Sequence, residues 1–449
     1  MRARHVLAAL LVTSVVAGIP VTATAATAAR HAPSVPRHPA PREAPDSAWQ
    51  ARIDGLIGQR RMSVTIGDDG AMWYGHLGWV TRPPASNEKL LLSMALLQVV
   101  GPDRVIATRA MASAAPVDGV IDGDLRLVGH GDPELAPDAL DALAGQIAKA
   151  GVTRIEGSVI GDTGPFERDW WADGWKDDFP AIEVAIPTAL TFSGNVGPDG
   201  RHIGDPELRA ARFLSKALRR RDVVVKGAAG TGAADGPSVK IATISSAPIV
   251  DILRRMNVDS VNFDAEVLGK VLGAEVSGTG SIGAGAAAID AFTEANGAPR
   301  FEHHDASGLS YADRVTSQGM VRLLWRVDDE PWAPDLRFAL PTGGQGTLEG
   351  RLGHLRIRAK TGTLTDVSAL SGWVWSRKVH DWVEFSILSQ GMSKDEAVRI
   401  EDAIVALVNA RATAPATWTP RLQVGGVPDD RDVRAIEPVS AGRSVPGPT

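Results

Sequence analysis

The strongest constraint on the fold is a helical run that is apolar on nearly every face. Residues 86–100 read SNEKLLLSMALLQVV and follow Pro83-Pro84, and polar side chains are concentrated in the first turn. A helix with apolar side chains all round is buried, because it has no face left for water. We therefore expect this helix at the centre of its domain, with Ser86 and Lys89 at its start.

Composition indicates a globular protein and excludes several classes of site. The 449 residues are 44% hydrophobic and 22% charged, which is enough for about two or three domains. The net charge of −6 gives no sign of an electrostatic nucleic-acid binder, so no nucleic-acid partner is expected. The chain has no cysteine, which excludes disulfides, thiolate metal sites and a cysteine nucleophile.

Both ends of the chain differ from its centre. Residues 1–28 carry two early arginines, an apolar run over 6–19 and small residues, a pattern that predicts an export signal rather than a membrane span. Residues 29–50 are rich in Pro and predict a linker, and residues 412–449 predict a loosely ordered tail. We expect an exported protein, periplasmic, wall-associated or secreted, with no stable membrane span after signal cleavage.

The centre reads as one domain interrupted by an insert. Residues 51–116 contain a hairpin pattern, RMSVTIGDDGAMWYG, before the apolar helix. Residues 117–245 alternate short strand-like pieces with helical stretches near 138–150 and 207–220, which predicts one or two inserted α+β subdomains. Residues 246–411 return to helices, then strands from about 360, then a last helix near 395–411. The two outer parts together form the expected catalytic domain.

The start of the apolar helix has a spacing suited to nucleophilic catalysis. Ser86 and Lys89 are three residues apart, so a helix places both side chains on one face about one turn apart. A neutral lysine there can accept the serine proton, and we expect both desolvation and a second cation, Lys360, to keep it neutral. The alternative is a helix-capping serine with a solvated lysine, but the chain contains no second Ser-x-x-Lys.

A Ser-x-Asn element occurs twice. Ser193 and Asn195 precede VGPDG and are interpreted as a loop end inside the insert. Ser260 and Asn262 precede the helical run FDAEVLGKVLGAEV, where the catalytic domain resumes. We choose the second pair, with Ser260 relaying a proton to the leaving amine and Asn262 donating to substrate or contacting Lys89. A capped helix in the core is the alternative.

Lys360, Thr361, Gly362 and Thr363 open a strand-like segment, KTGTL. A lysine with hydroxyls at a strand edge can hold a terminal carboxylate, and a glycine leaves room for a substrate backbone. The alternative is an exposed lysine before a turn. The three elements together predict an active-site serine acyl transferase.

With these elements placed, the chain resembles the D-alanyl-D-alanine carboxypeptidase/endopeptidase family, the class C low-molecular-mass penicillin-binding proteins. The resemblance extends over residues 49–411 and includes PASNEKLL, GDLRLVGHGDPEL, DSVNFDAEVL, DASGLSYADRVTSQGMVRLL and AKTGTLTDVSALSGWV. It implies the α/β (α+β) fold of penicillin-binding proteins and serine β-lactamases, in which a helical subdomain packs on an antiparallel sheet, plus inserted α+β subdomains.

The resemblance also implies a reaction and roles. It makes Ser86 the acylated nucleophile and Lys89 the base, gives Thr363 and Ser86 the oxyanion-binding N–H groups, and places Asp305, Ser307 and Gly308 near the site. The expected substrates are peptidoglycan stem peptides ending in D-Ala-D-Ala, with β-lactams as inhibitors and no cofactor or metal. Val261 departs from the aspartate often found there, and Glu88 adds an acid beside the base; either can slow turnover.

Other readings stay open. A wall-binding protein that has lost turnover, or a β-lactamase or esterase on the same fold, fits the same motifs. His303-His304-Asp305 lacks helical metal-ligand spacing and predicts a surface or supporting role. Trp170, Trp171 and Trp175 are expected to pack the insert rather than bind glycan, because the chain has twelve Trp and only two Tyr.

Overall fold

The computed structural model describes residues 47–410 apart from 69, 234–235, 237 and 378. The expected export signal, most of the linker and the tail lie outside the described residues. Helix α1 (Ser47–Ile57) already begins inside the stretch assigned to the linker. It begins there because Trp49, a single turn from its start, is buried in the core beside Ile53.

A five-stranded antiparallel sheet forms one half of the main domain, with strand order β13-β14-β15-β1-β2. The N-terminal strands are β1 (Met62–Asp68) and β2 (Ala71–His76), which confirms the predicted hairpin. They pair with three strands from the end of the chain: β13 (Ile357–Leu364), β14 (Val367–Ser376) and β15 (Asp381–Gln390). Strand β13 therefore lies at an edge of the sheet.

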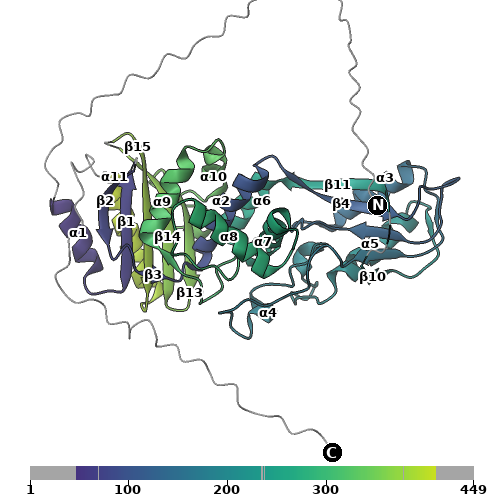
Figure 1. The fold of residues 1–449 in the computed structure, drawn as a ribbon, viewed down its shortest axis with the longest axis horizontal. Helices are drawn as coiled ribbons and strands as arrows, with labels where there is room; N and C mark the ends of the chain where they lie inside the picture. The colour runs from purple at the N-terminus through teal and green to yellow at the C-terminus, as the bar shows by residue number, and fades with distance from the viewer. Residues whose placement is uncertain (1–46, 69, 234–235, 237, 378, 411–449) are drawn as a thin grey trace, which may run out of the picture. The chain divides into compact units, whose positions relative to one another are not determined.

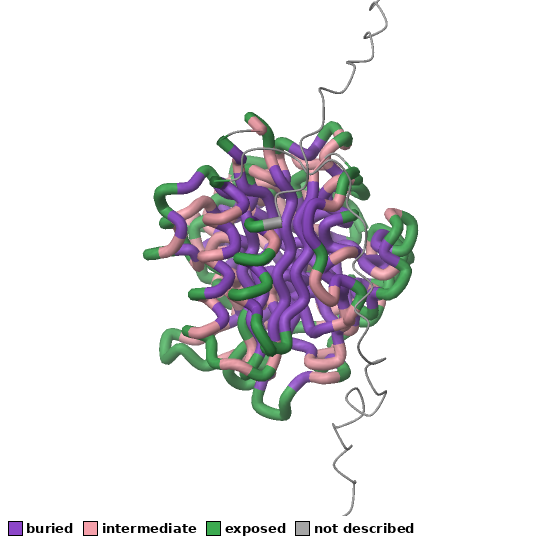
Figure 2. Tube along the Cα trace, turned by 90° about the vertical axis from the view of Figure 1, so that its left-hand side faces the viewer, coloured by how far each residue is buried: buried purple, intermediate pink, exposed green. Residues whose placement is uncertain are grey.

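Helices cover both faces of this sheet, so its strands are buried on both sides (Figure 2). On one face lie α1 and α11 (Lys394–Ala410), whose apolar side chains share a core with β1 and β14. On the other face α9 (Ser317–Asp328) contacts β1 and β15 (Figure 1). Cover on both faces explains why β14 and β15 are buried along most of their length, polar residues such as Ser371 and Glu384 included.

The predicted apolar helix is confirmed. It is α2 (Glu88–Val100), and a short 3₁₀ turn, η1 (Ala85–Asn87), leads into it. Ten consecutive residues of α2, from Glu88 to Leu97, are buried. The surrounding helices are α6 (Ile249–Asp259), α7 (Asn262–Ser277), α8 (Ile282–Ala295) and α10 (Ala333–Ala339). The site residues at the start of α2 are thus held in the middle of the domain.

Between the two parts of this domain the chain builds a second sheet with its own core. Its order is β10-β8-β6-β4-β11, and the strands are β4 (Val105–Ala112), β6 (Leu125–Val128), β8 (Val159–Asp162), β10 (Gly230–Gly232) and β11 (Val239–Pro248). Helices α3 (Pro137–Lys149) and α5 (Pro206–Arg219) pack on it. This α+β unit lies in the region of the predicted insert, 117–245. Its long strands begin at 105 and end at 248, outside those predicted bounds.

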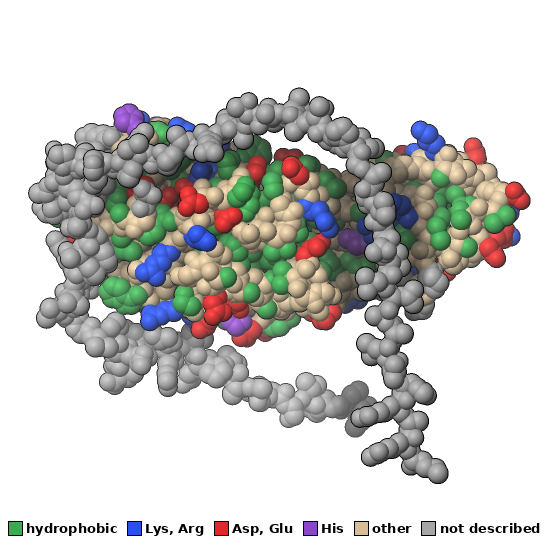
Figure 3. Space-filling model, turned by 45° about the horizontal axis from the view of Figure 1, so that its top comes forward, with side chains coloured by type: hydrophobic (Ala, Val, Ile, Leu, Met, Phe, Trp, Pro, Cys, Tyr) green, Lys and Arg blue, Asp and Glu red, His purple; other side chains and the backbone are tan. Residues whose placement is uncertain are grey.

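Smaller elements complete the described chain. They are the three-stranded sheet of β5 (Val120–Ile121), β7 (Arg154–Ile155) and β9 (Val224–Val225), the pair β3 (Thr81–Arg82) and β12 (Val315–Thr316), helix α4 (Phe179–Ile182), and the 3₁₀ turns η2 (Ser193–Asn195) and η3 (Gly346–Leu348). Among the described residues, no helix is long and apolar enough to traverse a bilayer. Side chains of both charges are interspersed on the face shown in Figure 3.

Candidate active site

Ser86 lies in the 3₁₀ turn that leads into α2, where it is partly exposed while its neighbours are buried. The preceding Ala85 has a positive φ of 47°, which is uncommon for a residue with a Cβ. Such strain is typical of positions where the surrounding structure holds a functional side chain in place. The turn presents the Ser86 hydroxyl at the start of the buried helix.

Lys89 is fully buried and directs its ammonium at three acceptors. Its Nζ lies 3.1 Å from Ser86 Oγ, 2.8 Å from Asn262 Oδ1 and 2.6 Å from the Ser307 carbonyl oxygen. The Ser-x-x-Lys spacing thus brings the two side chains together as predicted. The other two contacts fix the amine against the serine.

Burial lowers the pKa of Lys89 to about 8, although the negative charges of Asp305, Glu266 and Glu88 act in the opposite direction. Desolvation penalises the charged form of an amine, so a substantial fraction is neutral near pH 8. Desolvation is the main cause of this shift. Lys360 is a second buried amine whose charge interacts with that of Lys89, and the expectation that Lys360 helps to keep Lys89 neutral stays a prediction.

Ser260 and Asn262 sit at the junction of two helices. Ser260 ends α6 in the left-handed conformation, with φ 58°, and Asn262 is the first residue of α7. The sharp junction aims Ser260 Oγ at Lys360 Nζ, 2.9 Å away, and Asn262 Oδ1 at Lys89 Nζ. The competing pair is elsewhere: Asn195 is buried in the insert and bonds the backbone of Phe192 and Ile186.

Lys360 is fully buried on edge strand β13 and donates to Ser260 Oγ and to the Thr361 carbonyl, both at 2.9 Å. Burial, and then the charge of Lys89, lower its pKa well below the ordinary value. The repulsion between the two lysines disfavours the state in which both carry a charge. A substrate carboxylate placed beside it would restore its charge. The neighbouring Thr361 hydroxyl donates to Thr347 at 2.7 Å.

Gly362 lets β13 pass directly against the serine turn. A Cβ at this position would lie 2.6 Å from the Pro84 carbonyl oxygen and 3.1 Å from the Ser86 nitrogen. Any side chain would therefore push the strand away from the turn. Thr363, the next residue on the same edge strand, is exposed.

The loop that follows α8 closes the site from another side. Asp305 is buried, and its carboxylate accepts from the backbone N–H groups of Gly308 and Ser310 at 2.7 and 2.8 Å. Glu266 of α7 accepts from the Ser307 N–H at 2.8 Å, and burial raises the pKa of Glu266 to about 8. These two acids shape the loop so that the Ser307 carbonyl meets Lys89.

Glu88, two residues after Ser86, forms a buried pair with a histidine. Glu88 Oε1 and His303 Nδ1 are 2.7 Å apart, and both side chains are fully buried. Burial lowers the pKa of His303, but the charge and hydrogen bond of Glu88 outweigh it, so the net shift is upward. The carboxylate of Glu88 therefore contacts His303. His303 is buried and supports Glu88, so it is not a surface residue.

The insert also reaches the site. Trp175 Nε1 donates to Asp305 Oδ2 at 2.7 Å, and the Asn262 amide donates to Glu183 at 3.4 Å. Trp175 is buried in an apolar cluster, as expected. Trp171, by contrast, is 47% exposed. Sequence reasoning missed the contacts of Trp175, Glu183, Glu266 and Thr347, because no local spacing links them to the motifs.

Fold and site together define a class, the active-site serine enzymes built like penicillin-binding proteins. The solved structure of penicillin-binding protein 4 from Haemophilus influenzae superposes with a TM-score of 0.71 at 18% identity and covers 80% of this chain and 99% of its own. A peptidoglycan endopeptidase of Bdellovibrio bacteriovorus superposes with a TM-score of 0.52, 17% identity and coverages of 80% and 96%. The predicted fold class is confirmed.

The chain belongs to the D-Ala-D-Ala carboxypeptidase 3 (S13) family, whose pattern matches residues 53–199 and 182–411. A D-alanyl-D-alanine carboxypeptidase of Actinomadura sp. (strain R39) is 28% identical over 469 residues, covering 85% of this chain and 86% of the relative. A carboxypeptidase of Mycobacterium tuberculosis is 29% identical over 359 residues, covering 72% and 75%. The family predicted from the motifs is confirmed.

Proposed function

We propose that Ser86 carries out the family's reaction on peptidoglycan stem peptides that end in D-Ala-D-Ala, outside the cytoplasmic membrane. The observation that carries this proposal is the 3.1 Å contact between the Lys89 amine and the Ser86 hydroxyl. The amine is buried, which lowers its pKa to about 8. A hydroxyl needs such a base before it can attack a carbonyl. Lys360 on the facing strand receives the peptide carboxylate.

In the acylation step, neutral Lys89 takes the proton of Ser86, and Oγ attacks the carbonyl carbon of the penultimate D-Ala. The negative charge that develops on the carbonyl oxygen meets the N–H groups of Ser86 and Thr363. As the C–N bond breaks, Ser260 passes a proton to the leaving amine. The proton that Lys89 took from Ser86 then returns to Ser260 through Lys360, which leaves Lys89 neutral again. An ester on Ser86 and a free amine result.

Water then attacks the ester while Lys89 takes a proton from it. Lys89 returns this proton to Ser86 Oγ as the ester C–O bond breaks and the shortened peptide leaves. The leaving amine belongs to D-alanine in a carboxypeptidase and to a second stem peptide in an endopeptidase. β-Lactams follow the same first step, because opening the ring C–N bond leaves its amine tethered in the site. They are expected to acylate Ser86 and to inhibit the enzyme.

Labelling with a fluorescent penicillin tests the nucleophile. We expect the wild-type protein to be labelled and Ser86→Ala to lose the label completely. Ser193→Ala is the matched control, because Ser193 belongs to the other Ser-x-Asn pair and makes no contact with Lys89. An unlabelled wild type would favour a wall-binding protein without turnover.

Product analysis tests the substrate. Digestion of muropeptides followed by mass analysis is expected to show loss of a terminal D-Ala, separation of cross-linked stems, or both. Nitrocefin hydrolysis is measured in parallel. Fast nitrocefin turnover without any D-alanine release would replace this proposal with a β-lactamase.

A further inference from the structure

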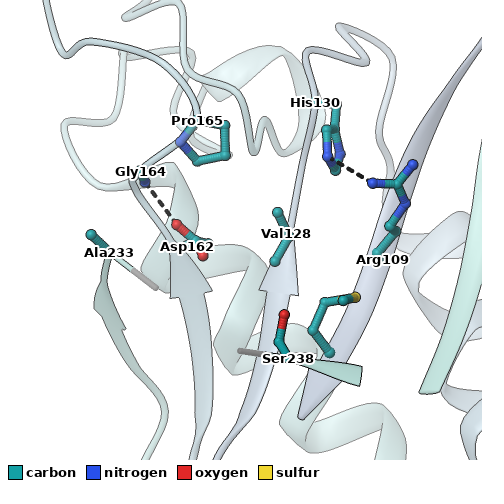
Figure 4. Close-up of a pocket in the computed structure, with 9 residues that line it drawn as sticks. Arg109, Val128, His130, Asp162, Gly164, Pro165, Ala233 and Ser238 are labelled. Carbon is teal, nitrogen blue, oxygen red and sulfur yellow. Dashed lines mark hydrogen bonds between the residues drawn. The ribbon is translucent and has the colours of Figure 1, made fainter. Parts of the chain in front are cut away.

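The sheet of the insert carries a cavity that the proposed reaction does not use. Helices α3 and α5 pack on one face of this sheet, and the cavity of about 350 Å³ lies over the strands β4, β6 and β8 (Figure 4). This volume is at the lower end of small-ligand sites. None of the site residues around Ser86 lines it.

One side of the cavity presents an unpaired cation. Arg109 of β4 donates one N–H to His130 Nε2 at 3.1 Å, and His130 Nδ1 lies 2.9 Å from the Ala107 carbonyl. Since Nδ1 must donate to that carbonyl, Nε2 is an acceptor and the imidazole is neutral. Burial, and then the Arg109 charge, lower the pKa of His130 in agreement with this state. Within the described residues no carboxylate pairs with Arg109.

The opposite side presents an unpaired anion. Asp162, at the end of β8, is only 2% exposed, and its Oδ1 accepts from the Gly164 N–H at 2.7 Å. The described part of the chain offers it no lysine or arginine as an ion-pair partner. Its carboxylate lines the cavity, where it can accept hydrogen bonds from a bound cation.

The floor between the two charges is apolar. Val128 of β6 lies between Asp162 and Arg109 in Figure 4, and Met111 and Pro165 also line the cavity. Because β6 separates β4 from β8, two strand spacings of roughly 4.8 Å each, about 9.5 Å, separate the backbones that carry the charges. A ligand that contacts both must therefore be dipolar and extended.

We infer that this cavity binds a short peptide of two or three residues, with its free carboxylate on Arg109 and its free ammonium on Asp162. A single amino acid carries both charges on one carbon and is too short. Two or three extended residues, at about 3.5 Å each, reach across the apolar floor. Arginine suits the carboxylate because its fork of N–H groups matches two oxygens.

The assignment of wall-derived peptides as the natural ligands rests on the proposed function; the binding itself does not. The test uses the full chain acylated with benzylpenicillin, so that the cleft at Ser86 is blocked. Isothermal titration calorimetry then measures binding of D-alanyl-D-alanine and of tri-D-alanine. Each peptide is also titrated as its N-acetyl and its C-terminal amide derivative.

We expect saturable binding of at least one free peptide, and at least tenfold weaker binding of both capped forms and of single D-alanine. Arg109→Gln and Asp162→Asn should each weaken binding at least tenfold. The matched controls are Lys240→Gln, a cation on the neighbouring strand β11, and Asp124→Asn, whose carboxylate accepts one backbone N–H as that of Asp162 does. The controls should bind like the wild type.

The inference is overturned if the acylated protein shows no saturable binding, or if capped and free peptides bind equally. The capped peptides keep this test independent of whether the variants fold. If penicillin fails to acylate the protein, the proposed function fails, but the same titrations on unlabelled protein still decide the peptide site. The two failures are therefore distinguishable.

Discussion

At the scale of single residues, the site depends on one amine whose charge is controlled by burial. Lys89 has three acceptors and still a pKa of about 8, because it is completely removed from water. Its contact with Ser86 follows from helical spacing, whereas its contacts with Asn262 and Ser307 come from distant segments. In the proposed mechanism only the neutral amine acts as the base, and its fraction grows as pH rises through the pKa, so we expect the reaction to depend on pH.

We predict that the rate of penicillin acylation rises with pH through about 8, because the neutral amine appears as the pKa of Lys89 is passed. Lys89→Ala should lower this rate about 10²- to 10⁴-fold, the usual contribution of a positioned base, and should remove the rising limb. Stopped-flow acylation between pH 6 and 9.5 measures both. A rising limb that persists in Lys89→Ala would exclude the lysine as the base.

Gly308 is the second sensitive residue. Its φ is +78°, and a Cβ there would lie 1.9 Å from the Ala85 carbonyl oxygen. Gly278, which ends α7, has nearly the same φ of +79°, but a Cβ on Gly278 would meet no atom within 4 Å. Comparing alanine substitutions at these two glycines therefore separates two costs: that of the left-handed backbone conformation, and that of a collision with the serine turn.

Gly278→Ala is therefore expected to lower the free energy of unfolding by about 1–2 kcal/mol, the conformational cost, and to leave acylation unchanged. Gly308→Ala should destabilise more and slow acylation as well, because the loop must move away from Ala85. Chemical denaturation and penicillin labelling measure the two effects. Equal behaviour of the two variants would contradict this account.

At the scale of elements, the sequence predicted those with a strong pattern. The helix after Pro83-Pro84, the hairpin and the helices α3, α5 and α11 lie within a few residues of their predicted positions. Strands β4 and β11 were not predicted. Strand β4 (VIATRAMA) alternates in burial but not in side-chain hydrophobicity, and β11 alternates poorly in burial. Propensity alone does not identify a strand whose burial is decided by its neighbours.

The contact between α9 and β15 contains a buried acid with a strongly shifted pKa. Glu384 of β15 is 3% exposed and accepts from Trp325 Nε1 at 2.8 Å, and burial raises its pKa to about 9. The folded protein therefore keeps this proton between the ordinary value of 4.5 and about 9, whereas the unfolded chain releases it. Stability due to this group is complete below about pH 4.5 and is lost as pH rises to about 9.

We predict that Glu384→Gln removes this contribution and makes the fall of stability with pH shallower, by up to about 1.4 kcal/mol per pH unit within that window. Urea unfolding at pH 5.5, 7 and 8.5 measures the slope. Glu294→Gln, at an exposed position of α8, is the control and should keep the wild-type slope. An unchanged slope in Glu384→Gln would show that the side chain is not protonated in the folded protein.

At the scale of the whole molecule, the insert has its own apolar core and is tied to the catalytic domain by both apolar and polar contacts. Lys270 of α7 donates to the carbonyl groups of Glu167 and Asp169 at 2.9 and 3.0 Å. Trp175 donates to Asp305, the acid that shapes the loop beside Lys89. The insert thus supports the geometry of the active site.

Trp175→Phe should remove one hydrogen bond to a buried carboxylate, destabilise the protein by about 1.5–3 kcal/mol and slow acylation by loosening the loop. Trp170→Phe is the matched control, because Trp170 bonds the Val184 carbonyl and not the loop. Its acylation rate should stay at the wild-type value. Thermal unfolding and penicillin labelling measure both variants, and equal acylation rates would deny the insert a role at the site.

The sequence by itself determined the parts whose physics is local. Helical spacing determined the pairing of Ser86 with Lys89, and continuous hydrophobicity determined the burial of their helix. The short motifs also identified the family, because order and context made them specific. The roles of Ser260, Asn262 and Lys360 in the reaction stay predictions.

Only the tertiary structure decided which distant groups surround the amine. Lys89 and Ser307 are 218 positions apart, and Lys360 and Ser260 are 100 apart, so no local period connects them. Burial, and with it every shifted pKa at the site, depends on neighbours that the chain brings together only when it folds. The peptide cavity of the insert has the same origin, because Arg109 and Asp162 face one space only after β6 lies between their strands.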